Sequence, residues 1–419
     1  MEILRRDGAA MCRATRLDLT RERLIASAAL LLLFAAVAIS TYAVFTSRWP
    51  GANDLLSRWE GARSFWVDGL NPYSDEVTER IQIEIYGRPA RADEDPGPFA
   101  YPFYAVFTLL PLVWLPYAWA QAIWMTLLAF SIVALALMSM ATLRWRVGPW
   151  ALAGTILFSL CFYFSARAVF LGQFAVLVAA FVAGSFLAIR SGRDGWAGVL
   201  LALSTLKPQM IFLIAPYVLM WAVVRRRWRL VVGFTASMAI LVGPSYALMP
   251  SWLGDFLRQL GNYTSYTAIG SPVWIIVQHY LHLGDAAEAI VAAVTGLALI
   301  GVWAYTLRRT DWGTFQWVCG LTLIVSNLIA LRTATTNYVI LYPALWLTAK
   351  ATVDRWQMRG QAIVIAAALA LLIGVWLLFS ATVVAKFEHP LVYLPLPFGL
   401  AFVFVAWRRQ LIDSAGQGR

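Results

Sequence analysis

The chain has 419 residues, of which 61% are hydrophobic and 13% are charged. Soluble domains carry about 25% charged residues, so this composition and a mean hydropathy of +0.69 exclude a soluble protein and predict an all-α, polytopic membrane protein. The net charge of +11 does not indicate a nucleic-acid partner, because the basic residues fall in short clusters between apolar runs, as they do in cytoplasmic loops of membrane proteins.

The three cysteines give no sign of a disulfide framework. Cys12 lies in a basic N-terminal segment, and Cys161 and Cys319 lie in apolar runs. No pair is therefore placed in an extracytoplasmic loop, where a disulfide would be expected. Neither redox chemistry nor a thiolate metal site is predicted.

The chain begins with a basic segment, residues 1–23, followed by the apolar run Leu24–Phe45. A membrane span needs about 20 helical residues, and this run is long enough for one. It exceeds the apolar region of a signal peptide and has no obvious small-residue cleavage site. We therefore expect an uncleaved anchor whose N-terminal tail, residues 1–23, is cytoplasmic.

Residues 46–100 form a first loop that is too long to be only a connector. It holds ten acidic residues against six arginines, a net charge of −4, which favours the extracytoplasmic side. Asn53 or Gly51 is predicted to cap a helix over Asp54–Asp68, and a second helix is predicted near Asp75–Tyr86. Apolar residues recur at helical spacing in the first helix, so it should lie along the membrane surface.

The later apolar stretches are separated by short basic connections. Tyr101–Pro116 is short and contains three prolines, so a half-inserted or surface helix is expected there, and Ala118–Leu143 is the next span. Pairs of crossings keep every later basic cluster inside, with a second extracytoplasmic loop at 249–287 and a cytoplasmic tail at 411–419. The total is about 11–13 transmembrane helices in a single domain, residues 24–410.

Lys207 is a charged residue inside an apolar stretch, in the sequence Leu206-Lys207-Pro208-Gln209. A cation at membrane depth costs ~2.5–3.5 kcal/mol on insertion scales and is by default a functional-site hypothesis. One interpretation is that Lys207 binds an anionic group such as a lipid phosphate. The alternative is that it reaches the outer headgroups or pairs with a structural carboxylate.

Further polar side chains fall at the predicted outer ends of spans. Arg167 and Gln173 flank one turn, and Arg332 and Asn337 lie among threonines at another. An arginine presents several donors to a phosphate, and amide side chains can orient sugar hydroxyls. Each arginine alone could equally be an interfacial residue on lipid headgroups. Convergence of both arginines with Lys207 on one face is a better signal than any single cation.

Asp54 comes directly after the first span, at the start of the predicted helix, and is the candidate for the residue that does chemistry. By composition alone it could instead stabilise the helix dipole or pair with Arg58 one turn later. Glu60 and Asp68 are similar acids in less favourable positions. The two histidines of the second loop lack accompanying acids at ligand spacing, so no metal site is predicted. No nucleotide-binding motif is present.

Several short motifs occur in a fixed order along the chain. They are Asp54 after the first span, Gly69-x-Asn71-Pro72-Tyr73, Phe99-Ala100-Tyr101-Pro102, Gly172-Gln173, Leu206-Lys207-Pro208-Gln209, and Asn337-Tyr338 before Tyr342-Pro343. Together they resemble the landmarks of glycosyltransferase family 87, whose members are integral-membrane enzymes of the GT-C type. The resemblance covers most of residues 20–350. It departs from the family pattern at Phe103, at Leu55-Leu56 and in lacking a histidine near Asn337, which leaves the donor sugar and acceptor open.

The resemblance implies a GT-C fold and transfer of a hexose, expected to be mannose, from a polyprenyl-phosphate sugar to a lipid or glycan acceptor. It implies Asp54 as the catalytic residue, while Lys207, Arg167 and Arg332 are expected to bind the donor phosphate. The enzyme is expected among the lipids of a bacterial plasma membrane, with its active site on the extracytoplasmic side and without cofactor or metal. The residues expected to bind substrate are Arg58, Tyr73, Tyr101, Gln173, Gln209 and Asn337.

The competing interpretation is a transporter or lipid flippase. In that case Lys207 and the short, broken helices around it would form a substrate site at membrane depth. The lack of an internal repeat and the long first loop argue against transport. A structural connection between Asp54 and Lys207 would favour transfer, and inverted symmetry would favour transport.

Overall fold

The computed structural model describes residues 2–49, 51–91, 94–266, 270–330, 332–384 and 388–417, with side chains except at 2–21 and 263–266. Within these ranges the chain forms helices and connecting loops without a β-strand. The prediction of an all-α fold is therefore confirmed.

The N-terminal part has two long helices separated by short ones. Phe34 of the first long helix meets Phe130 of the second with ring centroids 5.4 Å apart, and Tyr42 stacks on Trp119 at 3.8 Å. Such ring pairs contribute about 0.5–1.5 kcal/mol beyond their burial, so they hold the end of the first helix that leads into the first loop. The elements are α1 (Glu2–Thr41), η1 (Tyr42–Thr46), α2 (Asn53–Asp68), α3 (Asp75–Tyr86), α4 (Ala105–Leu109), η2 (Leu110–Leu112) and α5 (Tyr117–Thr142).

The central part consists of shorter helices with breaks between them. Two helices meet at Phe162 with a bend of 53°. Lys207 has non-helical φ and ψ of −131° and 81°, because the residue before a proline is pushed out of the helical region. The elements are α6 (Pro149–Cys161), α7 (Tyr163–Phe170), α8 (Ala175–Arg190), α9 (Asp194–Leu203), η3 (Ser204–Leu206), α10 (Pro208–Ile211), α11 (Ile214–Val224) and α12 (Trp228–Leu248).

The C-terminal part contains a helix of 41 residues, which is broken at Gln357 (φ 49°, ψ −121°). The break lies between Arg355 and Arg359, as expected for a basic turn between two spans. The elements are α13 (Trp252–Tyr266), α14 (Pro272–Trp274), η4 (Ile275–Tyr280), α15 (Gly284–Thr306), α16 (Trp312–Ile329), η5 (Thr335–Leu341), α17 (Tyr342–Thr382), η6 (Pro390–Tyr393), α18 (Pro395–Ala406) and α19 (Arg408–Gly416).

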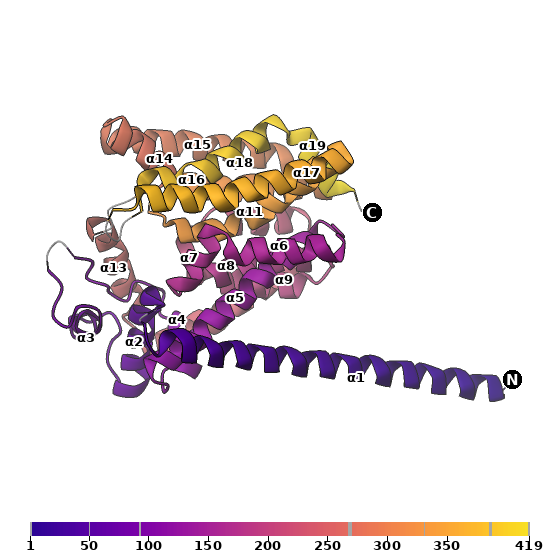
Figure 1. The fold of residues 1–419 in the computed structure, drawn as a ribbon, viewed down its shortest axis with the longest axis horizontal. Coiled ribbons are helices and arrows are strands. Elements are labelled where there is room, and N and C mark those ends of the chain that lie inside the picture. Colours follow the sequence, from indigo (N-terminus) through magenta and orange to yellow (C-terminus); the bar gives the residue numbers. More distant parts are fainter. Residues whose placement is uncertain are drawn as a thin grey trace.

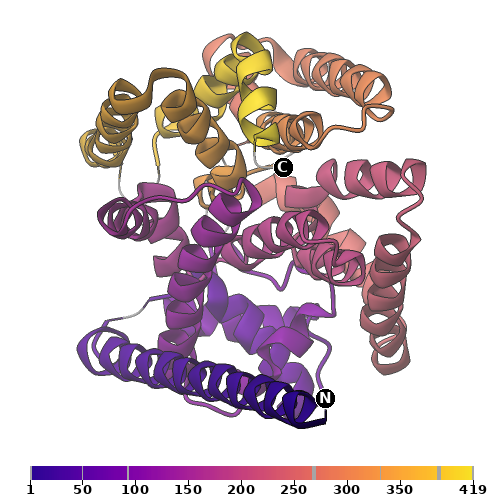
Figure 2. The same ribbon diagram turned by 90° about the vertical axis from the view of Figure 1, so that its right-hand side faces the viewer.

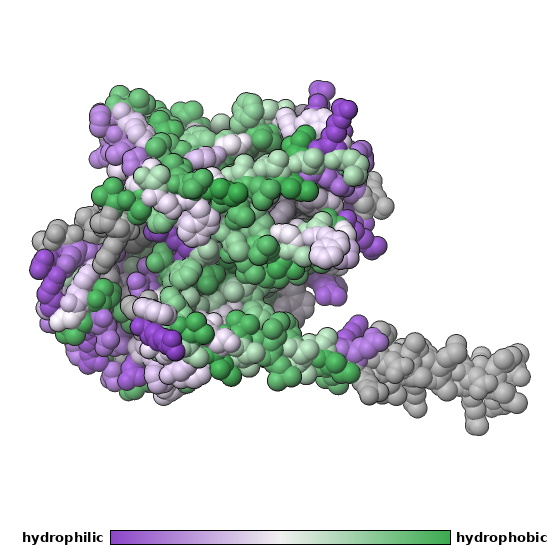
Figure 3. All heavy atoms as spheres, viewed as in Figure 1, coloured by the Kyte–Doolittle hydropathy of each residue, from purple (hydrophilic) through white to green (hydrophobic). Residues whose placement is uncertain are grey.

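The helices form one bundle with two distinct ends. In Figure 1, α2, α3 and α13 lie at one end, and the start of α1 and α19 lie toward the other. Figure 2 shows α1 along one edge of the bundle and the yellow C-terminal helices at the opposite edge. In Figure 3, hydrophobic residues cover the middle of the molecule and hydrophilic residues collect at its ends. This distribution suits a bundle whose middle is surrounded by lipid.

The number of long apolar helices is smaller than predicted. Six helices of the described residues are long and apolar enough to cross a membrane, or eight segments if each of two bent pairs is one span. The range of about 11–13 spans is reached only when three shorter apolar segments are included: Ala175–Arg190, Asp194–Leu206 and Ile214–Val224. The 16 residues of α8 extend about 24 Å, less than the roughly 30 Å of a hydrocarbon core.

The two helices of the first loop have the predicted bounds to within a residue. The expected cap of α2 by Asn53 or Gly51 is wrong, because α2 follows Ala52 and no side chain caps it. α2 also does not present a single buried face, since eight of its sixteen residues are buried. α3 and the α4 region pack around it, where Phe65 meets Phe103 with ring centroids 4.8 Å apart.

The segment 101–116 is a short helix packed under α2. α4 has five residues and η2 has three, so neither is long enough to cross a membrane. The indole of Trp59 donates to the carbonyl of Leu112 at 3.0 Å, and that of Trp66 donates to Val106 at 3.3 Å. These bonds hold the proline-rich segment against the first loop.

The two predicted outer loops contact each other through Asn71. Its Nδ2 donates to Asp255 Oδ2 at 3.1 Å, and its Oδ1 accepts from the backbone N–H of Tyr73 at 2.9 Å. Asp255 is buried and also accepts from Ser251 and Arg258, each at 2.9 Å. The Asn-Pro-Tyr sequence thus ties the turn after α2 to α13.

Candidate active site

Asp54 lies in the first turn of α2, which is docked by its backbone on the turn after α7. The N–H of Ala52 donates to the carbonyl of Phe170 at 2.7 Å, and the N–H of Asp54 donates to Leu171 at 2.9 Å. These carbonyls satisfy N–H groups that a helix start leaves unpaired. Ala52 adopts a left-handed φ of 49°, which costs an alanine about 1–2 kcal/mol, so the docking holds a conformation that the isolated turn would avoid.

One face of α5 holds both segments in place. Tyr117 Oη donates to the carbonyl of Ala52 at 2.8 Å, and Gln121 Nε2 donates to that of Gly51. Trp124 Nε1 donates to the carbonyl of Gly172 at 2.9 Å. Positions 117, 121 and 124 share one face of a helix because they are spaced four and three residues apart. The position of Asp54 relative to residue 172 is therefore set by α5.

Gly172 is required by this close approach. Its φ is +69°, and a Cβ added to it would lie 2.8 Å from the Cβ of Ala52 and 2.9 Å from that of Leu55. Any larger residue would push the start of α2 away from the turn. In the Gly-Gln sequence, Gly172 therefore permits the close approach of α2, and Gln173 is placed within reach of Asp54.

A chain of hydrogen bonds joins four side chains from four separate segments. Gln173 Nε2 donates to Asp54 Oδ2, and Gln173 Oε1 accepts from Lys207 Nζ at 2.7 Å. Lys207 Nζ also donates to Asn337 Oδ1 at 2.8 Å. Gln173, Lys207 and Asn337 are buried, whereas Asp54 is half-buried. The carboxylate is thus accessible from outside and linked to a buried ammonium through one amide.

Lys207 reaches this position because the chain leaves the helix there. η3 ends at Leu206 and α10 begins at Pro208, so the lysine side chain projects from a break. Tyr104 Oη donates to the carbonyl of Thr205 at 3.0 Å and fixes the residues before the break. A cation at membrane depth is tolerated where polar groups line its surroundings, and here two amide oxygens accept its protons.

Asn337 is oriented by its own segment. Its Nδ2 donates to Thr333 Oγ1 at 3.0 Å, and its backbone N–H donates to Ala334 at 2.9 Å. The amide oxygen is therefore directed at Lys207, as an acceptor for a cation must be. η5, which carries Asn337, lies between α16 and α17 in the chain.

Arg58 lies one helical turn beyond Asp54. Its guanidinium carbon is 4.7 Å from the ring centroid of Tyr101, a cation–π contact. Its Nη1 donates to Ser57 Oγ at 2.9 Å and to the backbone carbonyl of Asp54. These contacts hold the guanidinium of Arg58 beside the first turn of α2.

Arg167 is engaged by a carboxylate that the sequence analysis did not single out. Its Nε lies 3.3 Å from Glu388 Oε1, and its guanidinium carbon is 5.9 Å from the ring centroid of Phe379. The side chain of Arg167 is 24% exposed and that of Glu388 is 3% exposed. Phosphate binding by Arg167 remains a prediction.

Glu388 organises a buried polar cluster beside the hydrogen-bond chain. It accepts from Tyr163 Oη at 2.5 Å, from Thr335 Oγ1 at 2.6 Å and from Tyr393 Oη at 3.3 Å. Thr335 is two residues from Asn337, so the cluster holds the segment that carries that amide. One sequence signal was available: no other acidic residue occurs between positions 354 and 413.

Arg332 lies five residues before Asn337 in the chain. Its guanidinium carbon is 5.4 Å from the ring centroid of Trp274. Its Nε is buried without a hydrogen-bond partner among the described residues. A buried donor without a partner costs folding free energy. An anionic ligand that accepts from this Nε would remove that cost.

The remaining predicted substrate residues differ in their surroundings. Tyr73 is buried and its Oη donates to the backbone carbonyl of Tyr101 at 2.6 Å, which is a structural contact. Tyr101 is buried under Arg58. Gln209 is half-buried in α10, two residues from Lys207. Binding of substrate by these three residues remains a prediction.

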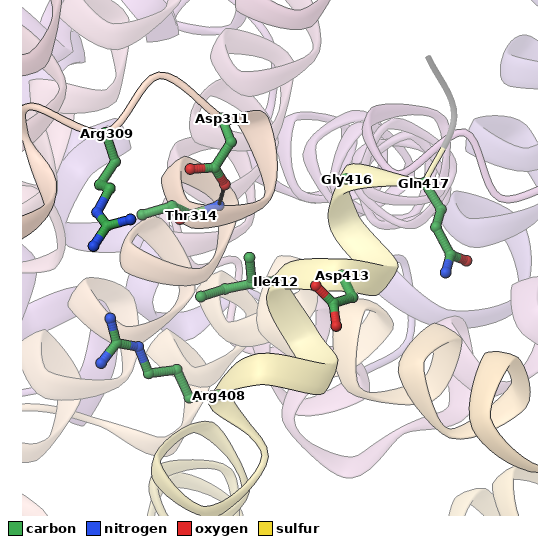
Figure 4. A pocket seen from close by; sticks show the side chains of 8 residues that line it. All are labelled: Arg309, Asp311, Thr314, Arg408, Ile412, Asp413, Gly416 and Gln417. Atoms are coloured by element: carbon green, nitrogen blue, oxygen red, sulfur yellow. Dashed lines mark hydrogen bonds between the residues drawn. The ribbon is translucent and has the colours of Figure 1, made fainter.

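A cavity of about 700 Å³ lies far from this network (Figure 4). It is lined by Arg309, Asp311 and Arg408, among others, at the start of α16, whereas Asn337 comes after the end of α16. The 18 residues of that helix extend about 27 Å. Asp311 accepts from the backbone N–H of Thr314 at 2.6 Å and caps α16. Among the described residues, no three His, Cys, Asp or Glu side chains come together as metal ligands.

Comparison with known proteins identifies the family of the chain. A family model described as Glycosyltransferase family 87 matches residues 99–327, more than half of the chain. The match includes Gln173 and Lys207, while Asp54 and Asn337 lie outside it. No curated protein and no solved structure matches. The chain belongs to glycosyltransferase family 87 and is a membrane glycosyltransferase, which acts on a sugar donor and an acceptor.

Proposed function

We propose that this enzyme moves a hexose, with mannose as the first candidate, from a polyprenyl-phosphate donor to a lipid or glycan acceptor. The observation that carries the proposal is the chain from the half-buried carboxylate of Asp54 through Gln173 to the buried ammonium of Lys207. It joins a group that can take a proton to a group that can stabilise a phosphate. A polyprenyl-phosphate sugar needs both, and it can reach a membrane-embedded site laterally.

Asp54 acts as the general base in this proposal. The acceptor hydroxyl oxygen forms a bond to C1 of the sugar while the bond from C1 to the phosphate oxygen breaks. The hydroxyl proton passes to the Asp54 carboxylate. Gln173 bonds Oδ2, which orients the carboxylate so that Oδ1 can face the acceptor. A single displacement inverts the anomeric centre and requires one carboxylate, not the pair that a retaining enzyme uses.

Lys207 acts on the leaving group. Negative charge increases on the phosphate as the C1–O bond breaks, and a fixed ammonium favours that state over the ground state. Its two amide acceptors hold the ammonium in position before the reaction. Arg332, with a buried and unpartnered Nε among the described residues, is the second candidate for the phosphate. Arg167 can bind the phosphate only if its ion pair with Glu388 opens.

We further propose that the active site faces the extracytoplasmic side of a bacterial plasma membrane. The support is the net charge of −4 in residues 46–100 and the position of α2, α3 and α13 at one end of the bundle, opposite the start of α1. The domain organisation proposed from the sequence is unchanged: tails at 1–23 and 411–419, and one transmembrane domain at 24–410. Transport is not carried forward, because family membership indicates transfer.

The test is transfer of labelled sugar by purified protein in lipid nanodiscs. The donor is polyprenyl-phosphate mannose and the acceptor is a membrane lipid extract. Loss of a general base costs about 10²–10⁴-fold in rate, so Asp54→Asn should lose at least about a hundredfold. Asp75→Asn is the matched control, because Asp75 is also a first-turn acid but is exposed in α3. It should retain activity.

Three outcomes would contradict parts of the proposal. Equal transfer by wild type and Asp54→Asn would remove Asp54 as the base. Transfer from another polyprenyl-phosphate sugar but not from mannose would correct the sugar alone. Transfer only from a nucleotide sugar would remove the lipid-linked donor and the role given to Lys207.

A further inference from the structure

A second cavity, of about 590 Å³, lies between the two helices of the first loop and the segment before α5. α2 contributes Trp59, Glu60 and Arg63, and α3 contributes Arg80 and Glu84. Both helices lie at the same end of the bundle (Figure 1). No role in the mechanism above uses these side chains.

This cavity is on the opposite side of α2 from Asp54. Helical residues are separated by about 100° around the axis, so Glu60 lies about 120° and Arg63 about 180° around α2 from Asp54. A ligand in the cavity would therefore be separated from the reacting atoms by the thickness of a helix. The cavity suits a part of a substrate that does not react.

Tyr117 links the cavity to the catalytic turn. Its ring lines the cavity and packs on Trp59 with centroids 5.0 Å apart, while its Oη donates to the carbonyl of Ala52 at 2.8 Å. Ala52 is two residues before Asp54. A ligand that packs on Tyr117 thus contacts a side chain that is hydrogen-bonded to the turn carrying Asp54.

The charges of the cavity favour a neutral ligand over an anion. Three acids and two arginines line it, and one of these pairs is already formed: Arg80 lies 2.7 Å from Asp68. The two arginines do not outnumber the acids, so the cavity has no excess positive charge to attract a phosphate. A hydroxyl group both donates and accepts hydrogen bonds, so a ligand with many hydroxyls can use carboxylates and guanidinium groups together.

Glu60 is the polar group best prepared for such a ligand. It is 8% exposed and accepts from Ser64 Oγ at 3.1 Å through Oε1. Burial raises the pKa of Glu60 above its ordinary value. Arg63 donates to the backbone carbonyl of Val113 at 3.2 Å and has no salt bridge to Glu60 in the described contacts. The carboxyl therefore keeps hydrogen-bonding capacity for a ligand.

Two indoles supply apolar surface in the same cavity. Trp59 is fixed by its bond to Leu112 at 3.0 Å, and Trp114 is 64% exposed. An exposed indole at the edge of a polar cavity offers an aromatic face to a ligand and a polar N–H beside it. The apolar face of a sugar ring fits such a surface, while its hydroxyl edge meets the polar groups.

We propose that this cavity binds a neutral, hydroxyl-rich glycan portion of the acceptor. The inference rests on the proposed function for the identity of the acceptor, but binding itself does not require transfer. It makes the cavity a determinant of acceptor choice that acts away from the reacting sugar. Trp114 stacks on a sugar ring and Glu60 bonds its hydroxyls.

Binding is measured directly with mannotriose, by saturation-transfer NMR and titration of purified protein in nanodiscs. Trp114→Ala and Glu60→Gln should each weaken binding about tenfold or more, since a lost contact of about 1.4 kcal/mol is a factor of ten. Trp150→Ala is the matched control, because Trp150 is 91% exposed at the start of α6. Asp54→Asn should bind as the wild type does, whatever its transfer activity.

Each outcome decides the inference. The inference is supported if both cavity variants bind mannotriose at least tenfold more weakly and both controls bind it as tightly as the wild type. Absence of mannotriose binding by the wild type, or equal binding by Trp114→Ala and wild type, overturns it. Displacement of the trisaccharide by vesicles of anionic phospholipid shows a headgroup site and also overturns it. Failure of the proposed function would appear separately, as transfer that survives Asp54→Asn.

Discussion

Replacing Gln173 with leucine tests the hydrogen-bond chain between Asp54 and Lys207. Leucine is close to glutamine in size, but it lacks the donor that reaches Asp54 Oδ2 and the acceptor 2.7 Å from Lys207 Nζ. Lys207 is 5% exposed and would keep only the Asn337 oxygen among the acceptors described here. Water therefore has little access to replace the lost partner.

The size of the effect follows from these two bonds. A hydrogen bond to a charged group contributes about 1.5–3 kcal/mol. The bond to buried Lys207 should count nearly in full and the bond to half-buried Asp54 less, so the free energy of unfolding should fall by about 2–4 kcal/mol. Loss of orientation at Asp54 should add about 1.4–2.8 kcal/mol to the barrier, which lowers kcat about 10- to 100-fold.

The assay combines stability and rate on the same nanodisc preparations. The Tm reports folding, and initial rates at saturating donor, corrected for the folded fraction, report kcat. Gln316→Leu is the matched control, because Gln316 is a buried amide of α16 whose Nε2 has no hydrogen-bond partner among the described residues. Combining Gln173→Leu with Asn337→Ala gives a double-mutant cycle in which the two acceptors of one ammonium should be non-additive.

The reasoning would be refuted by a Gln173→Leu protein with wild-type Tm and kcat. It would also be refuted if Gln316→Leu lost as much activity as Gln173→Leu, since a general effect of removing a buried amide would then suffice. Strict additivity with Asn337→Ala would show that the two amides do not act on the same group.

Three further substitutions test the supports of the site. Glu388→Gln should lower stability by up to about 3 kcal/mol and reduce kcat, because Arg167 loses its carboxylate; unchanged Tm and kcat would contradict this. Gly172→Ala should lower Tm and transfer far more than Gly69→Ala. Both glycines have positive φ, but of the two only Gly172 has atoms within 3 Å of a new Cβ. Equal effects of the two substitutions would show that the backbone strain of about 1–2 kcal/mol explains the loss without the close approach of α2. Asn71→Ala should speed proteolysis in 249–287, since the bond to Asp255 is lost; cleavage at the wild-type rate would show that the loops are held otherwise.

Local signals in the sequence were sufficient to predict the helices of the first loop. Ser74 caps α3, accepting from the N–H of Val77 at 3.3 Å. Gly69 and Gly87 end α2 and α3 with left-handed φ values of 71° and 69°. These are short-range effects, so they are visible in the sequence. The cap of α2 was predicted wrongly because its N–H groups are bonded by residues 170–171, more than 110 positions away.

The candidate site was predictable as a set of residues and not as a geometry. Asp54, Gln173, Lys207 and Asn337 could be selected because polar residues are costly at membrane depth and stand out in apolar sequence. Their order of contact could not be predicted, because it depends on the α5 face and on Gly172. Arg167 illustrates the difference, since its carboxylate partner is 221 positions along the chain.

The sequence by itself determined the membrane class, the positions of most helices and the family resemblance, because hydropathy, glycine, proline and charge act locally or through composition. The tertiary structure alone decided that Gln173 bridges Asp54 and Lys207, that Glu388 holds Arg167, and that a polar cavity lies on the far side of α2. These features depend on helix packing between distant segments, which sets distances that no short-range pattern encodes.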